Sequence, residues 1–256
     1  LIKAIVKDKK TKKTFFFRYH CDGEQPSWEI PEVGEITTGK WTYKGRTEHQ
    51  VQCHCQEIPE NGADIAHLNY LHLVAANEGS DITKIRLDIQ NRRVKHYWNG
   101  SWEPQPAPQQ HVGIMHLEEA ITFGNWKIPF TAAKLDAIQI GPGIVHMMFD
   151  FGSLGKGIVL QHVTPEKPLL QKCRFVMYST LPKILANIFM TCEAYQYERD
   201  VYVWNNKRFT RQPMLVKHDG PIMKFRRWYN QFYTENSPKL NWDGTVTDEI
   251  KSVLDW

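Results

Sequence analysis

The run CRFVMYSTLPKILANIFMTCEAYQYERDVYVWNN, residues 173–206, joins a strand pattern directly to a long helix pattern. Aromatic and β-branched residues dominate 173–179, as is typical of a strand. Pro182 follows Leu181, and proline fits the first turn of a helix because its missing N–H has no partner there in any case. The sequence therefore predicts a strand that ends near residue 179 and a helix over about 182–206.

Upstream of this run, the pattern from about 84 to 180 is that of successive strands. Ile85–Ile89 alternates cleanly, and Gly141-Pro142-Gly143 and Gly155-Lys156-Gly157 mark turns. Further strands are expected near 94–98, 112–123, 135–140, 144–151, 157–163 and 173–179.

Helix patterns flank these strands. One covers 59–77, with Pro59 at its start, and another covers about 220–234, with Asp219 as N-cap and Pro221 in the first turn. The order of helix, antiparallel strands and long helices predicts an α+β fold in which a curved sheet grips a long helix.

The first 40 residues differ from the rest. Residues 1–20 predict a hairpin whose tip, Lys7–Lys13, is basic. We interpret this tip as a solvated turn, with contact to anionic lipid or nucleic acid as the alternative. Proline and glycine are frequent over 22–40, which indicates a linker, and Trp41-Thr42-Tyr43 opens a new strand.

The composition of the 256 residues excludes a disordered tail, a collagen and a coiled coil, because 41% are hydrophobic and 23% charged. The net charge of +4 is too small to indicate a nucleic-acid partner, and we expect none. Five scattered cysteines do not suggest a disulfide framework. No stretch has the roughly 18 apolar residues of a membrane span. The chain begins at Leu1 without a signal-peptide pattern, and we expect it to be a piece of a longer protein.

The chemically most informative motif is Asp64-x2-His67-x4-His72. Imidazole nitrogens bind Fe, Zn, Cu or Ni, and a nearby carboxylate can be a ligand or a supporting acceptor. Residues five apart on a regular helix differ by about 140° in direction. His67 and His72 can therefore share one ion only if the helix ends, bends or bulges between them. The alternative is a pair of ordinary helix histidines.

A site with two histidines needs a third ligand, and the late helix offers Glu193, Glu198 and Asp200. Asp200 lies among apolar and aromatic neighbours, where a carboxylate needs a counter-charge or a metal. The alternative for Asp200 is an ion pair with Arg199 or Lys207. His146, between Ile144-Val145 and Met147-Met148, fits a core histidine better than a pocket residue.

The run Gln56–His72 resembles the iron-binding segment of Rieske-type oxygenases, and most closely that of the animal cholesterol 7-desaturases, the Neverland family. Residues 19–32 resemble the exit from that family's Rieske domain. Residues 203–207 and 219–233 resemble its C-terminal helices. The resemblance runs in order over most of residues 15–240.

The resemblance implies that His67 and His72 bind a mononuclear Fe(II) and that Asp200 completes the facial triad. It implies a catalytic role for Asp64, which would hydrogen-bond near the first iron histidine and link electron flow from a neighbouring subunit. Asn61 is similar to a family asparagine near the iron. The fold would be a START-like helix-grip domain over 41–256, and residues 1–40 would be the remnant of the Rieske-domain end with its linker.

One departure from the family concerns the [2Fe-2S] Rieske cluster, which needs Cys-x-His and a later Cys-x-x-His. Neither motif occurs here, and Cys53-His54-Cys55 has the residues in the wrong order. The cluster is therefore expected only in the full-length protein.

The resemblance also implies a function, which is O2-dependent desaturation of cholesterol at C7–C8 to 7-dehydrocholesterol. The partners would be a sterol, O2, an NAD(P)H-dependent reductase and two further subunits of a homotrimer, and the full-length protein would be membrane-associated. The alternatives are a Rieske-type steroid hydroxylase and a non-catalytic sterol-binding helix-grip protein.

Overall fold

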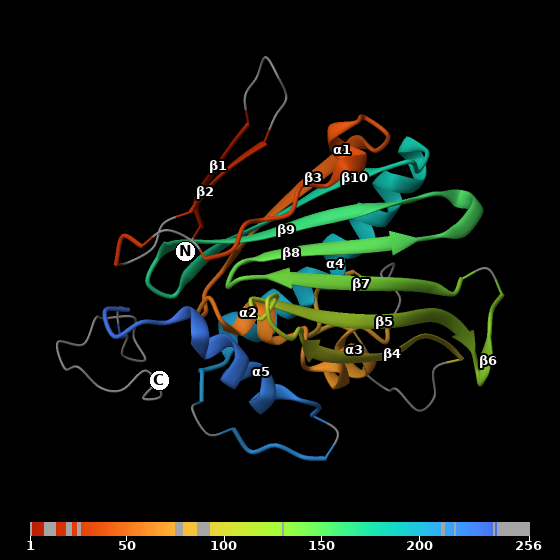
Figure 1. The fold of residues 1–256 in the computed structure, drawn as a ribbon. Coiled ribbons are helices and arrows are strands. Elements are labelled where there is room, and N and C mark those ends of the chain that lie inside the picture. Colours follow the sequence, from red (N-terminus) through yellow and green to blue (C-terminus); the bar gives the residue numbers. More distant parts are fainter. Residues whose placement is uncertain are drawn as a thin grey trace.

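The computed structural model describes residues 2–7, 14–18, 22–24, 27–74, 79–85, 93–129, 131–210, 213–217, 219–237 and 239, the first two ranges as backbone only. Its centre is an eight-stranded antiparallel sheet in the order β3-β10-β9-β8-β7-β5-β4, with the two-residue β6, Trp126–Lys127, paired to β5 (Figure 1). The other strands are β3 Thr42–Val51, β4 Val94–Pro104, β5 Val112–Phe123, β7 Ala133–Ile140, β8 Ile144–Asp150, β9 Lys156–Lys167 and β10 Leu170–Ser179.

One face of the sheet packs against the long helix α4, Lys183–Asn206 (Figure 1). Met190, Val201 and Trp204 of α4 join a buried cluster with Val159 of β9 and Phe175 of β10. These strand residues belong to an alternating set, because successive side chains of a strand point to opposite faces. The predicted α+β arrangement of an antiparallel sheet that grips a long helix is confirmed.

The opposite face of the sheet is covered by the segment that precedes β3. Trp28 and Ile30 pack on Ile140 and Ile144, and this segment also contains the short helix α1, Gly34–Thr37. The predicted hairpin is confirmed as β1, Ile2–Lys7, paired antiparallel with β2, Thr14–Arg18. Residues 8–13 of the basic tip lie outside the described residues, and the domain boundary near residue 40 stays a prediction.

The expectation of one continuous helix over 59–77 is wrong. The structure has two short helices, α2 at Glu57–Glu60 and α3 at Ile65–Leu71, separated by a turn. Helix α2 begins at Glu57, so Pro59 is its third residue and not its first. At this start, the Glu57 carboxylate accepts a hydrogen bond from the His54 backbone N–H at 3.0 Å. The break before α3 falls where Asp64 caps the second helix.

The last helix is also shorter than expected. Helix α5 covers Ile222–Tyr229 and continues as a 3-10 turn, Asn230–Phe232. Asp219 does not cap it, because its carboxylate accepts the Val216 N–H at 2.6 Å instead, and Pro221 occupies the cap position. A second 3-10 turn, Gly152–Leu154, joins β8 to β9. The strand expected at 85–89 lies mostly outside the described residues.

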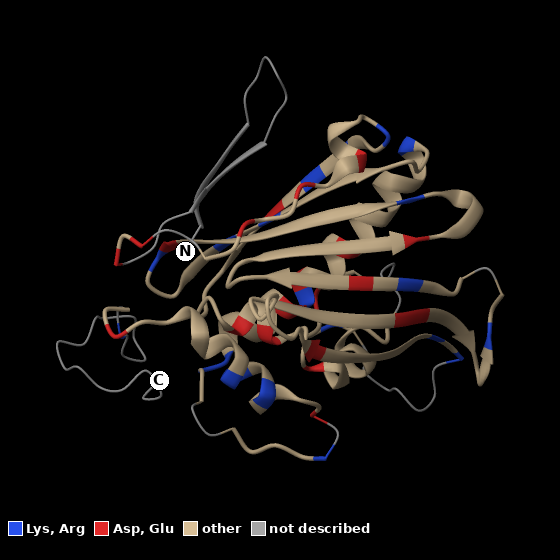
Figure 2. Ribbon diagram, in the orientation of Figure 1, with Lys and Arg blue, Asp and Glu red and all other residues tan. Residues whose placement is uncertain are grey.

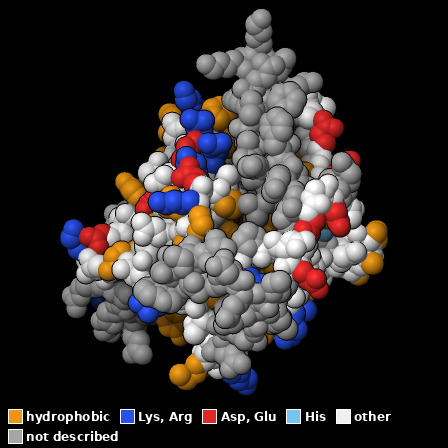
Figure 3. Space-filling model, turned by 90° about the vertical axis from the view of Figure 1, so that its left-hand side faces the viewer, with side chains coloured by type: hydrophobic (Ala, Val, Ile, Leu, Met, Phe, Trp, Pro, Cys, Tyr) orange, Lys and Arg blue, Asp and Glu red, His pale blue; other side chains and the backbone are white. Residues whose placement is uncertain are grey.

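Charged side chains occur on most strands of the sheet, for example Lys134 and Asp136 on β7. In β8 and β9 they lie towards the strand ends, where Asp150 pairs with Lys156 (Figure 2). On the described part of the face in Figure 3, basic and acidic side chains lie next to one another. Within the described ranges, no helix has the length and apolarity needed to cross a bilayer.

Candidate metal centre

The first element of the site is helix α3, which begins at Asp64. The Asp64 carboxylate accepts the backbone N–H of His67 at 3.2 Å, as an N-cap side chain does. The imidazole of His67 folds back, and its Nδ1 donates a hydrogen bond to the Asp64 carbonyl oxygen. A carbonyl can only accept, so Nδ1 carries the proton and the lone pair of Nε2 points away from Asp64.

His72 follows directly on the last residue of α3, Leu71. Its φ of −102° and ψ of 5° leave the helix, and the Trp98 indole N–H donates to its carbonyl oxygen at 3.2 Å. This ending redirects the side chain, so that the rings of His67 and His72 meet with centroids 5.2 Å apart and planes at 81°. The predicted interruption of the helix between the two histidines is confirmed.

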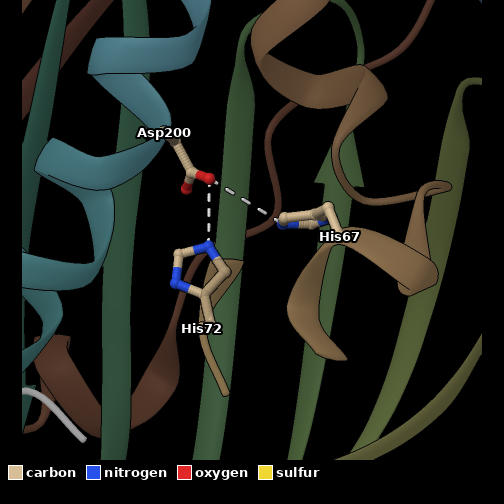
Figure 4. Close-up of side chains that lie close together, drawn as sticks. All are labelled: His67, His72 and Asp200. Atoms are coloured by element: carbon tan, nitrogen blue, oxygen red, sulfur yellow. Dashed lines mark hydrogen bonds and ion pairs between the residues drawn. The ribbon is translucent and has the colours of Figure 1, made fainter. Parts of the chain in front are cut away.

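Asp200 reaches the histidines from α4, and its carboxylate points towards both imidazole rings (Figure 4). Its Oδ1 lies 3.0 Å from His72 Nε2 and 4.0 Å from His67 Nε2. One ligand atom from each of the three residues lies within 4.8 Å of the others. The alternative ion pairs of Asp200 are wrong, because Lys207 pairs with Glu57 at 3.1 Å and the Arg199 guanidinium donates to oxygens of other residues.

Gln196, one turn before Asp200 on α4, orients His72. Its Oε1 accepts from His72 Nδ1 at 2.8 Å and from Arg199 Nη1 at 3.2 Å, and its Nε2 faces His96 Nδ1 at 3.4 Å. Since Arg199 can only donate, Oε1 is an acceptor and His72 Nδ1 carries the proton. Both histidines thus direct Nε2, the atom that a metal needs, towards Asp200.

The electrostatics agree with this arrangement. Burial lowers the pKa of His67, which favours the neutral imidazole that metal binding requires. Burial also opposes a charge on His72, but the Asp200 carboxylate and the hydrogen bonds with Asp200 and Gln196 outweigh it and raise the pKa of His72.

The three residues open on a cavity of about 170 Å³ between the sheet and α4. Most of its wall is apolar, with Trp98, Trp102 and Met147 among the lining residues. Two carboxyl groups also face it. Burial raises the pKa of Glu193 to about 7, and burial together with the charge of Glu193 raises that of Glu119 to about 8.

The structure brings together His67, His72 and Asp200, with Asp64 directly beside His67 and Asn61 on the cavity wall. Glu193 lines the cavity, whereas Glu198 is partly exposed and pairs with His49. Sequence reasoning missed Gln196 and Arg199. The spacing of Gln196, four residues before Asp200, places both on one helix face and was the available signal.

Two neutral imidazoles and one carboxylate on one side of an ion form the donor set of a facial triad, which leaves coordination positions open. The donor set fits Fe(II), and the supporting hydrogen bonds fix the tautomer of each histidine as such sites require.

Residues 18–233 match the family model described as the 3-ketosteroid 9alpha-hydroxylase C-terminal domain. The chain is 56% identical over 240 residues to a cholesterol 7-desaturase of Caenorhabditis elegans, covering 93% of this chain and 56% of the relative. It is 42% identical over 243 residues to a cholesterol 7-desaturase of Xenopus laevis, covering 94% and 52%. The chain therefore spans about half the length of the curated relatives that it matches.

A more distant relative and a solved structure also match this chain. The oxygenase component of 3-ketosteroid-9-alpha-monooxygenase of Rhodococcus rhodochrous is 25% identical over 234 residues, covering 86% of this chain and 57% of the relative. The crystal structure of dicamba monooxygenase bound to dicamba superimposes with a TM-score of 0.56 at 11% identity, covering 90% of this chain and 68% of that one. At this identity, the structural likeness shows the fold alone.

Proposed function

The chain belongs to the family of 3-ketosteroid 9alpha-hydroxylase C-terminal domains, and from this premise we propose that it is the catalytic part of an iron-dependent sterol desaturase. The reaction is the O2-dependent desaturation of cholesterol at C7–C8 to 7-dehydrocholesterol. The convergence of His67, His72 and Asp200 above an apolar cavity carries the proposal. The 56% identity to a cholesterol 7-desaturase supports the substrate.

His67 Nε2, His72 Nε2 and an Asp200 carboxylate oxygen would hold Fe(II), which supplies oxygen activation at its open positions when bound. The chain's own residues bind and orient the sterol. The apolar wall excludes water, and it holds an unactivated C–H bond beside the metal without the need for an acid or base. Gln196 keeps the His72 tautomer fixed throughout.

The rest of the protein would supply the electrons. We propose that a [2Fe-2S] Rieske cluster outside this chain, reduced by an NAD(P)H-dependent reductase, serves the iron of a neighbouring subunit in a homotrimer. Asp64 would connect the two centres, because it touches His67 through both its carboxylate and its carbonyl group. An apolar substrate dissolved in membranes further implies that the full-length protein works at a membrane.

Steroid hydroxylation is the second candidate function. It is favoured by the family model and by the relative named as a 3-ketosteroid-9-alpha-monooxygenase. Mass spectrometry of the product formed from cholesterol by the full-length protein separates the two reactions, because desaturation removes two hydrogens and hydroxylation adds one oxygen.

Anaerobic titration with Fe(II) tests the metal site in the 256-residue chain. We expect one iron per chain, lost in His67→Ala and in Asp200→Ala, and retained in His116→Ala, whose imidazole is exposed on β5. Sterol binding by a chain that binds no iron would contradict the enzyme and would support a non-catalytic sterol-binding protein.

A further inference from the structure

The sheet floor of the cavity carries two buried glutamines. Gln139 on β7 is 4% exposed and Gln161 on β9 is 9% exposed, and both line the cavity. Val145 of β8 is the register partner of each, so the two glutamines flank it on the same face of the sheet. Adjacent antiparallel Cα atoms are about 5 Å apart, so the two glutamines stand about 10 Å from each other. A group above Val145 is therefore within reach of both amides.

These amides are not fully paired within the protein. Gln139 Nε2 donates to the Gly141 carbonyl at 3.2 Å, which leaves its Oε1 open. In the part of the chain that the structure describes, the Gln161 side chain has no hydrogen bond. Buried polar groups normally have partners, and an exception on a cavity wall points to a ligand or a water molecule.

The glutamines and the metal ligands lie on opposite walls. Gln161 is the register partner of Phe175, whose ring meets that of Tyr197 on α4 with centroids 4.6 Å apart. Tyr197 lies one turn before Asp200. A rigid molecule held at the sheet floor by the amides therefore lies beneath the metal ligands on α3 and α4.

We propose that Gln139 and Gln161 form an amide subsite that binds the hydroxyl group of a hydroxysterol. The subsite rests on the proposed function, since it assigns the anchor of that substrate. A hydroxyl group donates one hydrogen bond and accepts others, so Gln139 Oε1 accepts its proton and Gln161 Nε2 donates to its oxygen. Two neutral amides in an apolar wall suit a hydrocarbon skeleton with one polar end, because they place no unpaired charge against it.

The test compares cholesterol with cholest-5-ene, which lacks only the hydroxyl group, as ligands of the 256-residue chain. Both are supplied from cyclodextrin, and binding is followed by quenching of the indoles that line the cavity, Trp98 and Trp102. We expect Gln161→Leu to weaken cholesterol binding about 10-fold, as loss of one hydrogen bond does, and to change cholest-5-ene binding less than about 2-fold. Its thermal midpoint should not fall, because leucine removes an unpaired amide.

Met147→Leu is the matched control on the same floor, and it should change the binding of both sterols equally. The proposal is overturned if Gln161→Leu affects both sterols alike or neither. It is also overturned if Glu119→Gln, and not Gln161→Leu, abolishes the difference in affinity between cholesterol and cholest-5-ene. Equal binding of both sterols by the wild type overturns the amide subsite alone, whereas no binding of either overturns the proposed function with it.

Discussion

Gln196 shows how a neutral residue prepares a metal ligand. It has no lone pair directed at the metal position, but its Oε1 fixes the tautomer of His72 and is itself held by Arg199. The orientation of the ring therefore does not depend on the metal. Because such supporting hydrogen bonds raise the basicity of an imidazole, the affinity of the site should depend on this amide.

We expect Gln196→Leu to lower the affinity for Fe(II) by about 10-fold to 100-fold, the usual effect of losing a supporting hydrogen bond. The measurement is an anaerobic Fe(II) titration of the purified chain. Asn187→Leu removes an amide from the exposed side of the same helix and is the control. Unchanged affinity in Gln196→Leu would show that His72 is held by other contacts.

Helix α4 organises the site because its inward face carries Asp200, Gln196 and Arg199 within two turns. Arg199 is 0% exposed and donates to the carbonyl oxygens of Val74 at 2.8 Å and Gly79 at 2.7 Å. Its guanidinium thus ties the segment after α3 to α4. Val74 lies two residues after His72, so this tie helps to fix the position of His72.

Arg199→Lys should lower the free energy of unfolding by about 3 kcal/mol, since an ammonium cannot span the carbonyl groups that the planar guanidinium joins. Urea unfolding measures the loss. Arg174→Lys, at the half-exposed pair with Glu48, should cost less than about 1 kcal/mol. Equal losses in the two variants would mean that the Arg199 contacts contribute no more than a surface pair.

The sheet separates two environments. One face lines the cavity, and the other is buried beneath residues 27–41. His146 lies on the second face and is 6% exposed, as expected for a core histidine. Burial lowers its pKa to about 4, and burial with the charges of His146 and Arg174 lowers that of His162 to about 3.

These histidines should make the fold sensitive to acid. In the unfolded chain the pKa of a histidine is near 6.5. Below this pH the unfolded chain binds protons that the folded chain does not bind, so the free energy of unfolding decreases as the pH is lowered from about 6.5 to about 4. Thermal unfolding should show a loss of roughly 2 kcal/mol for His146 between about pH 7 and pH 5. His146→Leu should reduce the dependence of the free energy of unfolding on pH, and His116→Gln, at an exposed site, should not. The same pH dependence in His146→Leu and in the wild type would contradict a buried, neutral His146 as its cause.

Local patterns in the chain were sufficient for much of the architecture. Alternation and helical spacing predicted the strands and the long helix, because hydrophobic periodicity follows directly from side-chain geometry. Binding of one ion by both His67 and His72 required the helix to end, bend or bulge between them, and the structure has a helix end at Leu71.

Other features could not be read locally. Asp64 caps α3, so the helix expected over 59–77 is divided there. Asp219 binds the Val216 N–H and does not cap the last helix, which begins later than expected. The approach of Asp200 to His72, 128 positions away, and the pairing of Arg199 with Val74 and Gly79 required the folded sheet to set α4 opposite α3. Contacts between distant segments depend on how whole faces pack, and no periodicity within one segment encodes its partner.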